Sequence, residues 1–132
     1  MLICVTNRKL CRDDFLSRIK QLAQGKPHAI MLREKDLSLT EYEGLAAKVK
    51  EICDSCEVLL IINQNIATAT KLKITNIQLS ISDLRLYKNE VSKFAVGCSV
   101  HSVSEAKEAE KLGASYLIAG HIFPTDCKKG IP

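Results

Sequence analysis

The feature that most constrains this chain is a regular alternation of short apolar runs with longer segments of helical periodicity. Runs rich in Val, Ile and Leu between polar residues predict strands, and apolar residues three and four positions apart predict helices. We expect six strands, at residues 2–6, 28–32, 58–62, 76–79, 94–98 and 115–118. A repeat of about 20–25 residues predicts an α/β fold of βα units around a parallel sheet.

The segments between the strands carry helix signals of different strength. Ser38 or Thr40 can open the helix after the second strand, and Thr40 and Glu43 have the spacing of a capping box. A short helix is expected at residues 66–72. The connection through residues 84–87 has no clear pattern.

Composition limits the class of protein. With 132 residues, 46% of them hydrophobic, residues 1–132 are expected to form a single domain with a real core. No apolar run is long enough to span a bilayer and no signal peptide is visible, so we expect a cytoplasmic protein without a membrane partner. A net charge of +4 without a basic block gives no support for nucleic-acid binding.

Six cysteines lie in apolar strands and at helix ends, which predicts free thiols instead of a disulfide framework. Cys53 and Cys56 form a CxxC pair, but this pair closes a predicted helix. A redox pair is expected at a helix start, and a structural zinc site needs a second pair. We therefore expect the pair to be structural.

Many candidate reactive side chains lie close together in residues 114–130, with the sequence ASYLIAGHIFPTDCKKG. Its apolar part predicts a strand buried on both faces, and polar groups begin where that strand would end. Polar residues also follow the earlier strands, as at the rim of a TIM-type (β/α)8 barrel. No glycine-rich dinucleotide motif or P-loop is present. Six strands would make this barrel incomplete.

These residues carry a resemblance to a known family. Five short motifs occur in order at or after the second to sixth predicted strands. They are MLREK, IIN, IQLSISD, GCSVHSVSEA and GHIFPTDCKKG. Together they resemble the thiamine phosphate synthase and TenI superfamily, whose fold is a TIM-type barrel. The resemblance covers nearly the whole chain, and GHIFPTDCKKG is its most specific part.

Departures from the synthase pattern favour the TenI branch of that superfamily. The resemblance to a synthase implies two magnesium carboxylates; Asp83 matches one, and Gln64 stands at the place of the other. Further departures are Met31, Gln78, Ser80, Ile81, His121 and Cys127. The resemblance to TenI implies a thiazole tautomerase, an isomerase that converts a carboxythiazole phosphate to its aromatic tautomer in thiamine biosynthesis.

The resemblance also implies a site. His121 would be the acid and base, because an imidazole can remove and return a proton near neutral pH. Cations would hold the phosphorylated thiazole, and no cofactor is needed. The substrate-binding residues implied are Arg33, Lys35, Asn63, Ser99, Thr125 and Lys128. In the competing interpretation, residues 33–36 are only a solvated charged loop.

Two alternative functions stay open. The first is a thiamine phosphate synthase, a transferase that joins a pyrimidine diphosphate to a thiazole phosphate, with magnesium at Asp83. The second is a non-catalytic, truncated or regulatory TenI-like protein. Bare apolar strands at both edges of a six-stranded sheet predict that a homo-oligomer or another segment covers them.

Overall fold

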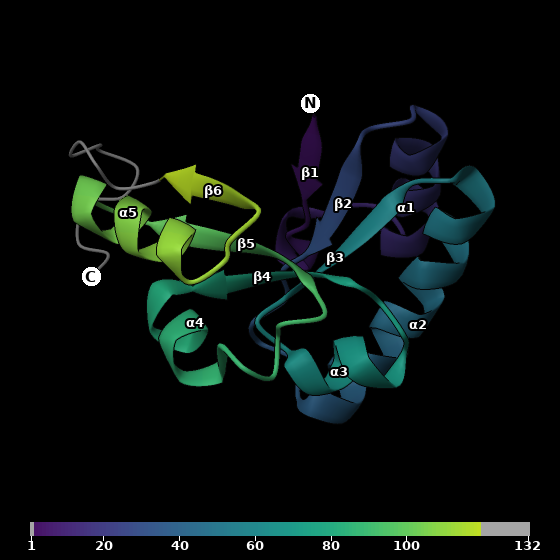
Figure 1. The fold of residues 1–132 in the computed structure, drawn as a ribbon. Helices are drawn as coiled ribbons and strands as arrows, with labels where there is room; N and C mark the ends of the chain where they lie inside the picture. Colours follow the sequence, from purple (N-terminus) through teal and green to yellow (C-terminus); the bar gives the residue numbers. More distant parts are fainter. Residues whose placement is uncertain (1, 120–132) are drawn as a thin grey trace. The chain divides into compact units, whose positions relative to one another are not determined.

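A computed structural model describes residues 2–119 of the 132-residue chain (Figure 1). The six predicted strands are confirmed, and each differs from its expected bounds by at most two residues at either end. The chain divides into two compact units, Met1–Ile77 and Gln78–Pro132. The boundary falls within the fourth strand, β4 (Asn76–Ser80).

The first unit contains three complete βα pairs. Its elements, in chain order, are β1 (Ile3–Val5), the 3-10 helix η1 (Arg8–Leu10), α1 (Phe15–Gln24), β2 (Ala29–Leu32), α2 (Leu39–Cys56), β3 (Leu59–Asn63) and α3 (Ile66–Lys71). The strands are parallel, with Ile3 opposite Ala29 and Ala29 opposite Leu59. Because the strands run in one direction, their carboxyl ends meet at one edge of the sheet.

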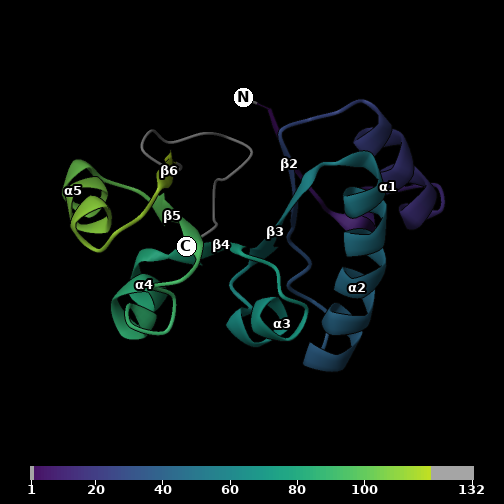
Figure 2. The same ribbon diagram turned by 45° about the vertical axis from the view of Figure 1, so that its right-hand side comes forward.

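Strand β2 lies in the middle of these three strands, and all four of its residues are buried. Helices α1 and α2 lie side by side along β2 and β3 (Figure 2). Both helices turn small or branched side chains inward; the fully buried ones are Ile19, Ala23, Ala46, Val49 and Cys53. An apolar strand covered in this way explains the uninterrupted aliphatic sequence AIML.

The start of α2 agrees with one of the two predicted N-caps, Ser38, but not with the predicted capping box. Ser38 is the N-cap, and its hydroxyl accepts the Glu41 N–H at 3.2 Å while the Glu41 carboxylate accepts the Ser38 N–H at 3.0 Å. The capping box predicted for Thr40 and Glu43 is therefore wrong. Both pairs have the required spacing, and the extended backbone at Ser38 decides between them.

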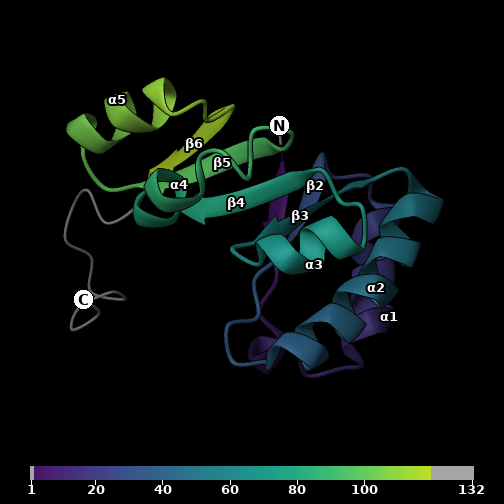
Figure 3. The ribbon, with the colours of Figure 1, turned by 60° about the horizontal axis from the view of Figure 1, so that its bottom comes forward.

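The second unit contains the end of β4, α4 (Ile81–Tyr87), β5 (Ala95–Val100), α5 (Val103–Lys111) and β6 (Tyr116–Ala119). Strands β5 and β6 are parallel, with Gly97 opposite Tyr116. Helix α5 packs along both strands (Figure 3). Helix α4 occupies part of the connection that had no clear sequence pattern, and Ser80 caps it by accepting the Asp83 N–H at 3.1 Å.

The outer strands β1 and β6 expose several apolar side chains. Val5 of β1 is 52% exposed, and Leu117 and Ile118 of β6 are 40% and 37% exposed. The expectation that the sixth strand is buried on both faces is wrong for the described residues, because only β5 pairs with it there. Among residues 2–119, no helix is both long and apolar enough to cross a membrane.

Candidate functional site

The carboxyl ends of β1, β2 and β3 bring polar residues together in the first unit. Leu32 lies opposite Ile62, so Arg33 and Asn63 occupy equivalent positions at the ends of neighbouring strands. Val5 lies opposite Met31, and the Thr6 N–H continues the pairing by donating to the Met31 carbonyl at 3.0 Å. The ends of all three strands therefore form one continuous edge.

The loop after β2 alternates exposed and buried charges. Arg33 and Lys35 are exposed, whereas Glu34 between them is only 5% exposed. The Glu34 carboxylate accepts hydrogen bonds from the Thr6 hydroxyl at 2.7 Å and from the Arg8 N–H at 2.9 and 3.0 Å. The interpretation of this segment as only a solvated charged loop is wrong for Glu34.

The positive charges near this loop divide into two groups. The Arg8 guanidinium bonds Asp36 at 2.6 Å, and the Lys9 ammonium lies 3.8 Å from the same carboxylate. In contrast, no ion pair formed by residues 2–119 involves Arg33 or Lys35. These two exposed cations can therefore bind an anionic ligand without first breaking such a pair.

Tyr42 of α2 links the ends of β2 and β3. Its buried hydroxyl donates to the Leu32 carbonyl at 2.6 Å and accepts the Asn63 N–H at 3.3 Å. Burial raises the pKa of the Tyr42 phenol well above its ordinary value, so the group stays protonated and keeps its donor. The Tyr42 hydroxyl therefore links the backbone at the end of β2, next to Arg33, to the backbone of Asn63 at the end of β3.

Gln64 follows Asn63 in a left-handed conformation with φ of 65°. This conformation is uncommon for a residue with a side chain, and in proteins it concentrates at functional sites. Next to it, the Asn65 side chain caps α3 by accepting the Thr68 N–H at 3.1 Å. The position at which the resemblance implies a second magnesium carboxylate thus lies at a turn between β3 and α3.

Two predicted residues lie in the second unit. Ser99 of β5 accepts a 2.9 Å hydrogen bond from the Gln78 carboxamide, and Gln78 is 2% exposed. Asp83 lies in the first turn of α4 and is partly exposed. No group of three or more His, Cys, Asp or Glu residues within 2–119 is arranged to hold a metal ion.

The remaining predicted residues, His121, Thr125 and Lys128, lie outside the described residues. Of the predicted residues, the described structure therefore brings together Arg33, Lys35 and Asn63, on one edge of the first unit. Sequence reasoning missed Thr6 and Tyr42 as supports of this edge. A threonine at the end of the first strand was a usable signal, but nothing local marked Tyr42.

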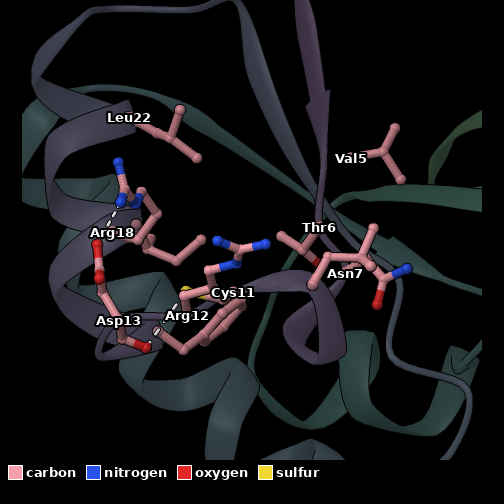
Figure 4. Close-up of a pocket in the computed structure, with 11 residues that line it drawn as sticks. Val5, Thr6, Asn7, Cys11, Arg12, Asp13, Arg18 and Leu22 are labelled. Carbon is pink, nitrogen blue, oxygen red and sulfur yellow. Dashed lines mark hydrogen bonds and ion pairs between the residues drawn. The ribbon is translucent and has the colours of Figure 1, made fainter.

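A groove of about 500 Å³ lies elsewhere in the first unit, between the end of β1 and α1 (Figure 4). Arg12 and Arg18 are among the residues that line it, and Arg18 is paired with Asp13. The other lining residues are Val5, Thr6, Asn7, Leu10, Cys11, Phe15, Ile19 and Leu22. Arg33, Lys35 and Asn63 do not line this groove, so it is not the predicted anion site.

Comparison with known proteins identifies related sequences along almost the whole chain. The family described as "Thiamine monophosphate synthase" matches residues 2–132. A thiamine-phosphate synthase of Fusobacterium nucleatum is 36% identical over 94% of this chain and 62% of its own length. One from Desulfitobacterium hafniense is 37% identical over 97% of this chain and 64% of its own length.

A solved structure agrees with these relatives. The thiamine phosphate pyrophosphorylase from Pyrococcus furiosus superposes with a TM-score of 0.82 and is 28% identical, covering 95% of this chain and 62% of its own. This likeness confirms the predicted fold class, an α/β protein with six parallel strands that match an incomplete TIM-type barrel. The chain spans less than two thirds of the length of these three relatives.

The comparisons overturn the prediction of a TenI-like thiazole tautomerase. The relatives at 36 and 37% identity are named thiamine-phosphate synthase, and the solved relative is a pyrophosphorylase. The departures at Gln64, His121 and Cys127 therefore do not place the chain in the TenI branch. Single differences in short motifs separate two branches of one superfamily poorly, whereas identity across the chain samples every position.

Proposed function

Because the chain belongs to the thiamine monophosphate synthase family, we propose that it supplies the diphosphate-binding side of an enzyme that joins a pyrimidine diphosphate to a thiazole phosphate. This enzyme is a transferase. The names of the relatives favour this proposal over an isomerase. The exposed cations after β2, which form no ion pair within residues 2–119, support binding of a phosphorylated substrate.

The reaction explains why such cations are needed. The thiazole nitrogen forms a bond to the methylene carbon of the pyrimidine, and the bond from that carbon to the diphosphate oxygen breaks. The bonding electrons leave with the diphosphate, which departs as pyrophosphate. Fixed positive groups near the leaving oxygens stabilise the charge that develops there. No proton has to be removed from a ring carbon, so this chemistry does not call for a histidine base.

The observation that carries the proposal is the pair of exposed cations, Arg33 and Lys35, on either side of buried Glu34. Arg33 can bind two phosphate oxygens at once through its planar guanidinium, and Lys35 adds a point charge. Both lie at the carboxyl end of a strand, where active sites of TIM-type barrels are found. We assign the diphosphate to this edge.

Asp83, in the second unit, is the residue that the synthase proposal assigns to magnesium. Asp83 is partly exposed in the first turn of α4, so its carboxylate is accessible. Magnesium in proteins is commonly held by one or two carboxylates together with water and substrate phosphate oxygens. When bound, magnesium would neutralise part of the diphosphate charge.

The test is a titration of the chain with inorganic pyrophosphate by calorimetry at low ionic strength. We expect Arg33→Ala and Lys35→Ala each to weaken binding by about tenfold, as for loss of a charge-assisted hydrogen bond. Lys48→Ala is the matched control, because it removes one positive charge from an exposed position on α2. Its affinity is expected to equal that of the unmodified chain.

Turnover tests the reaction itself. The chain is mixed with the pyrimidine diphosphate, the thiazole phosphate and magnesium, and pyrophosphate and thiamine phosphate are measured together. Equal amounts of both products, lost in Arg33→Ala, support the transferase. Pyrophosphate affinity that is the same in Arg33→Ala, Lys48→Ala and the unmodified chain would contradict the proposed site.

We also propose that the exposed apolar strands are covered when the protein works, by a second copy of this chain. Val5 and Leu117 are 52% and 40% exposed on outer strands of their units. Such strands offer unpaired backbone groups to a partner. Light scattering during size-exclusion chromatography is expected to show an oligomer, and a monomer at all concentrations would contradict this.

A further inference from the structure

Glu34 is a charged group in a place where charges are costly. Its side chain is almost fully enclosed, although its neighbours Arg33 and Lys35 are exposed. A carboxylate removed from water must be compensated by hydrogen bonds or by an opposite charge. Its partners therefore show what this residue does.

Those partners all come from the segment after β1. The Arg8 N–H donates to both carboxylate oxygens, at 2.9 and 3.0 Å, and the Thr6 hydroxyl donates to one of them at 2.7 Å. The Arg8 guanidinium nitrogen Nε lies 3.8 Å from the other oxygen. Glu34 thus ties the loop after β2 to the chain that leaves β1.

The direction of the hydrogen bonds at Thr6 is unambiguous. A carboxylate only accepts, so the Thr6 hydroxyl must give its proton to Glu34. The oxygen of that hydroxyl then accepts the backbone N–H of Arg33 at 3.0 Å. The Glu34 carboxylate, the Thr6 hydroxyl and the Arg33 N–H therefore form a continuous chain of hydrogen bonds. This relay of hydrogen bonds ends at the backbone from which the Arg33 side chain projects.

The same loop is braced again at its far end. The Arg8 guanidinium bonds Asp36 at 2.6 Å, on the other side of Lys35. Arg8 therefore contacts two acidic groups, Glu34 and Asp36, and both contacts stabilise the loop after β2. Both exposed cations lie between anchored residues.

We infer that Thr6 and Glu34 are positioning residues, which fix the backbone at Arg33 so that its guanidinium is held ready for a diphosphate. The inference rests on the proposed function, since it assumes that Arg33 binds the anion. Without the relay the loop would have to become ordered when the ligand binds. That ordering would lower affinity.

The test compares Thr6→Val with Thr6→Ser. Valine has nearly the shape of threonine but neither donates to Glu34 nor accepts from Arg33, whereas serine keeps both hydrogen bonds. With inorganic pyrophosphate as probe, we expect Thr6→Val to bind about tenfold more weakly and Thr6→Ser to bind like the unmodified chain. Urea unfolding of each variant gives the folded fraction, to which the affinities are referred.

A second measurement does not depend on a ligand. Hydrogen exchange of the Arg33 amide, followed by NMR, is expected to become faster in Thr6→Val and to remain slow in Thr6→Ser. The amides of α1 serve as the internal reference, since global destabilisation would speed them as well. Faster exchange confined to Arg33 and its neighbours supports the relay.

Glu34→Gln probes the other end of the relay. The carboxamide has the size of the carboxylate, but its NH2 group replaces one of the two oxygens that accept the Arg8 N–H. We expect weaker pyrophosphate binding and faster exchange at Arg33. If this variant does not fold, the two Thr6 variants decide the question alone.

The outcomes separate the two proposals. If Arg33→Ala binds pyrophosphate with the same affinity as the unmodified chain, the proposed anion site is wrong. The relay is then tested by the hydrogen-exchange rates alone. If Arg33→Ala weakens binding but Thr6→Val does not, the anion site stands and the positioning role is overturned. An unchanged exchange rate of the Arg33 amide in Thr6→Val overturns the relay in either case.

Discussion

Tyr42 and Leu32 are joined by a 2.6 Å hydrogen bond from the buried phenolic hydroxyl to the backbone carbonyl oxygen. The same hydroxyl oxygen accepts the Asn63 N–H at 3.3 Å. One helical side chain therefore connects two parallel strands just where the predicted ligand-binding residues begin. This bridge supports the edge from within the core, as the Thr6 and Glu34 relay supports it from β1.

Tyr42→Phe is expected to destabilise the protein by about 1–3 kcal/mol, because it leaves a buried carbonyl and a partly buried N–H without their partner. The ring remains, so apolar packing changes little. Urea unfolding measures the loss. Tyr87→Phe is the control, since Tyr87 is 37% exposed at the end of α4. Equal stability of both variants would contradict the bridge.

The stability is also expected to fall at alkaline pH. Burial raises the pKa of Tyr42 in the folded protein, whereas an unfolded tyrosine ionises near its ordinary value of about 10. Above that pH, loss of the proton lowers the free energy of the unfolded state, whereas the folded state keeps its proton and is not stabilised in this way. This contribution is complete below about pH 10 and lost above it. Urea midpoints at several pH values should fall less steeply in Tyr42→Phe.

Gly97→Ala is expected to destabilise the second unit. A methyl group at this position would collide with the ring of Tyr116 and with the side-chain oxygen of Gln78. Overpacking of this kind costs about 1–3 kcal/mol or more.

The matched control is Gly44→Ala in α2, where a methyl group meets nothing within 4 Å. This change is expected to stabilise by about 0.5–1 kcal/mol, because glycine is unfavourable within a helix. Thermal unfolding measures both variants. Shifts of the same sign would contradict the close packing at Gly97.

Ser38→Ala is expected to cost about 0.5–2 kcal/mol through loss of the N-cap of α2. Thr40→Ala tests the alternative cap that the sequence allowed, and its effect should be within about 0.5 kcal/mol. Circular dichroism during urea unfolding gives both values. A larger loss of stability in Thr40→Ala than in Ser38→Ala would contradict Ser38 as the N-cap of α2.

Cys53 is expected to resist alkylation in the folded protein at pH 8. Burial raises its pKa to about 11, so little of the reactive thiolate is present. Cys56, its CxxC neighbour, is partly exposed at the end of α2. Peptide mapping after brief exposure to iodoacetamide should show label at Cys56 well before Cys53. Equal labelling in the folded state, as expected in urea, would contradict a structural role for Cys53.

Much of the fold could be predicted because its information is local. Aliphatic runs such as AIML and LLIIN mark buried parallel strands, and the helix between them carries its own start signal at Ser38. Where two local signals had the same spacing, at Ser38 and Thr40, the sequence alone could not choose. The exposure of Leu117 and Ile118 was also hidden, since an apolar run does not reveal how many neighbours it has.

The candidate site shows the same division. Arg33, Lys35 and Asn63 could be named from their positions after strands, by the sequence itself and by family resemblance. That Glu34 turns inward to Thr6 and Arg8, 28 and 26 residues away, was decided only by tertiary structure. From sequence alone, a charged residue within a charged run is expected to be exposed to solvent. Burial depends on which distant segment packs over a residue, and no local pattern encodes that.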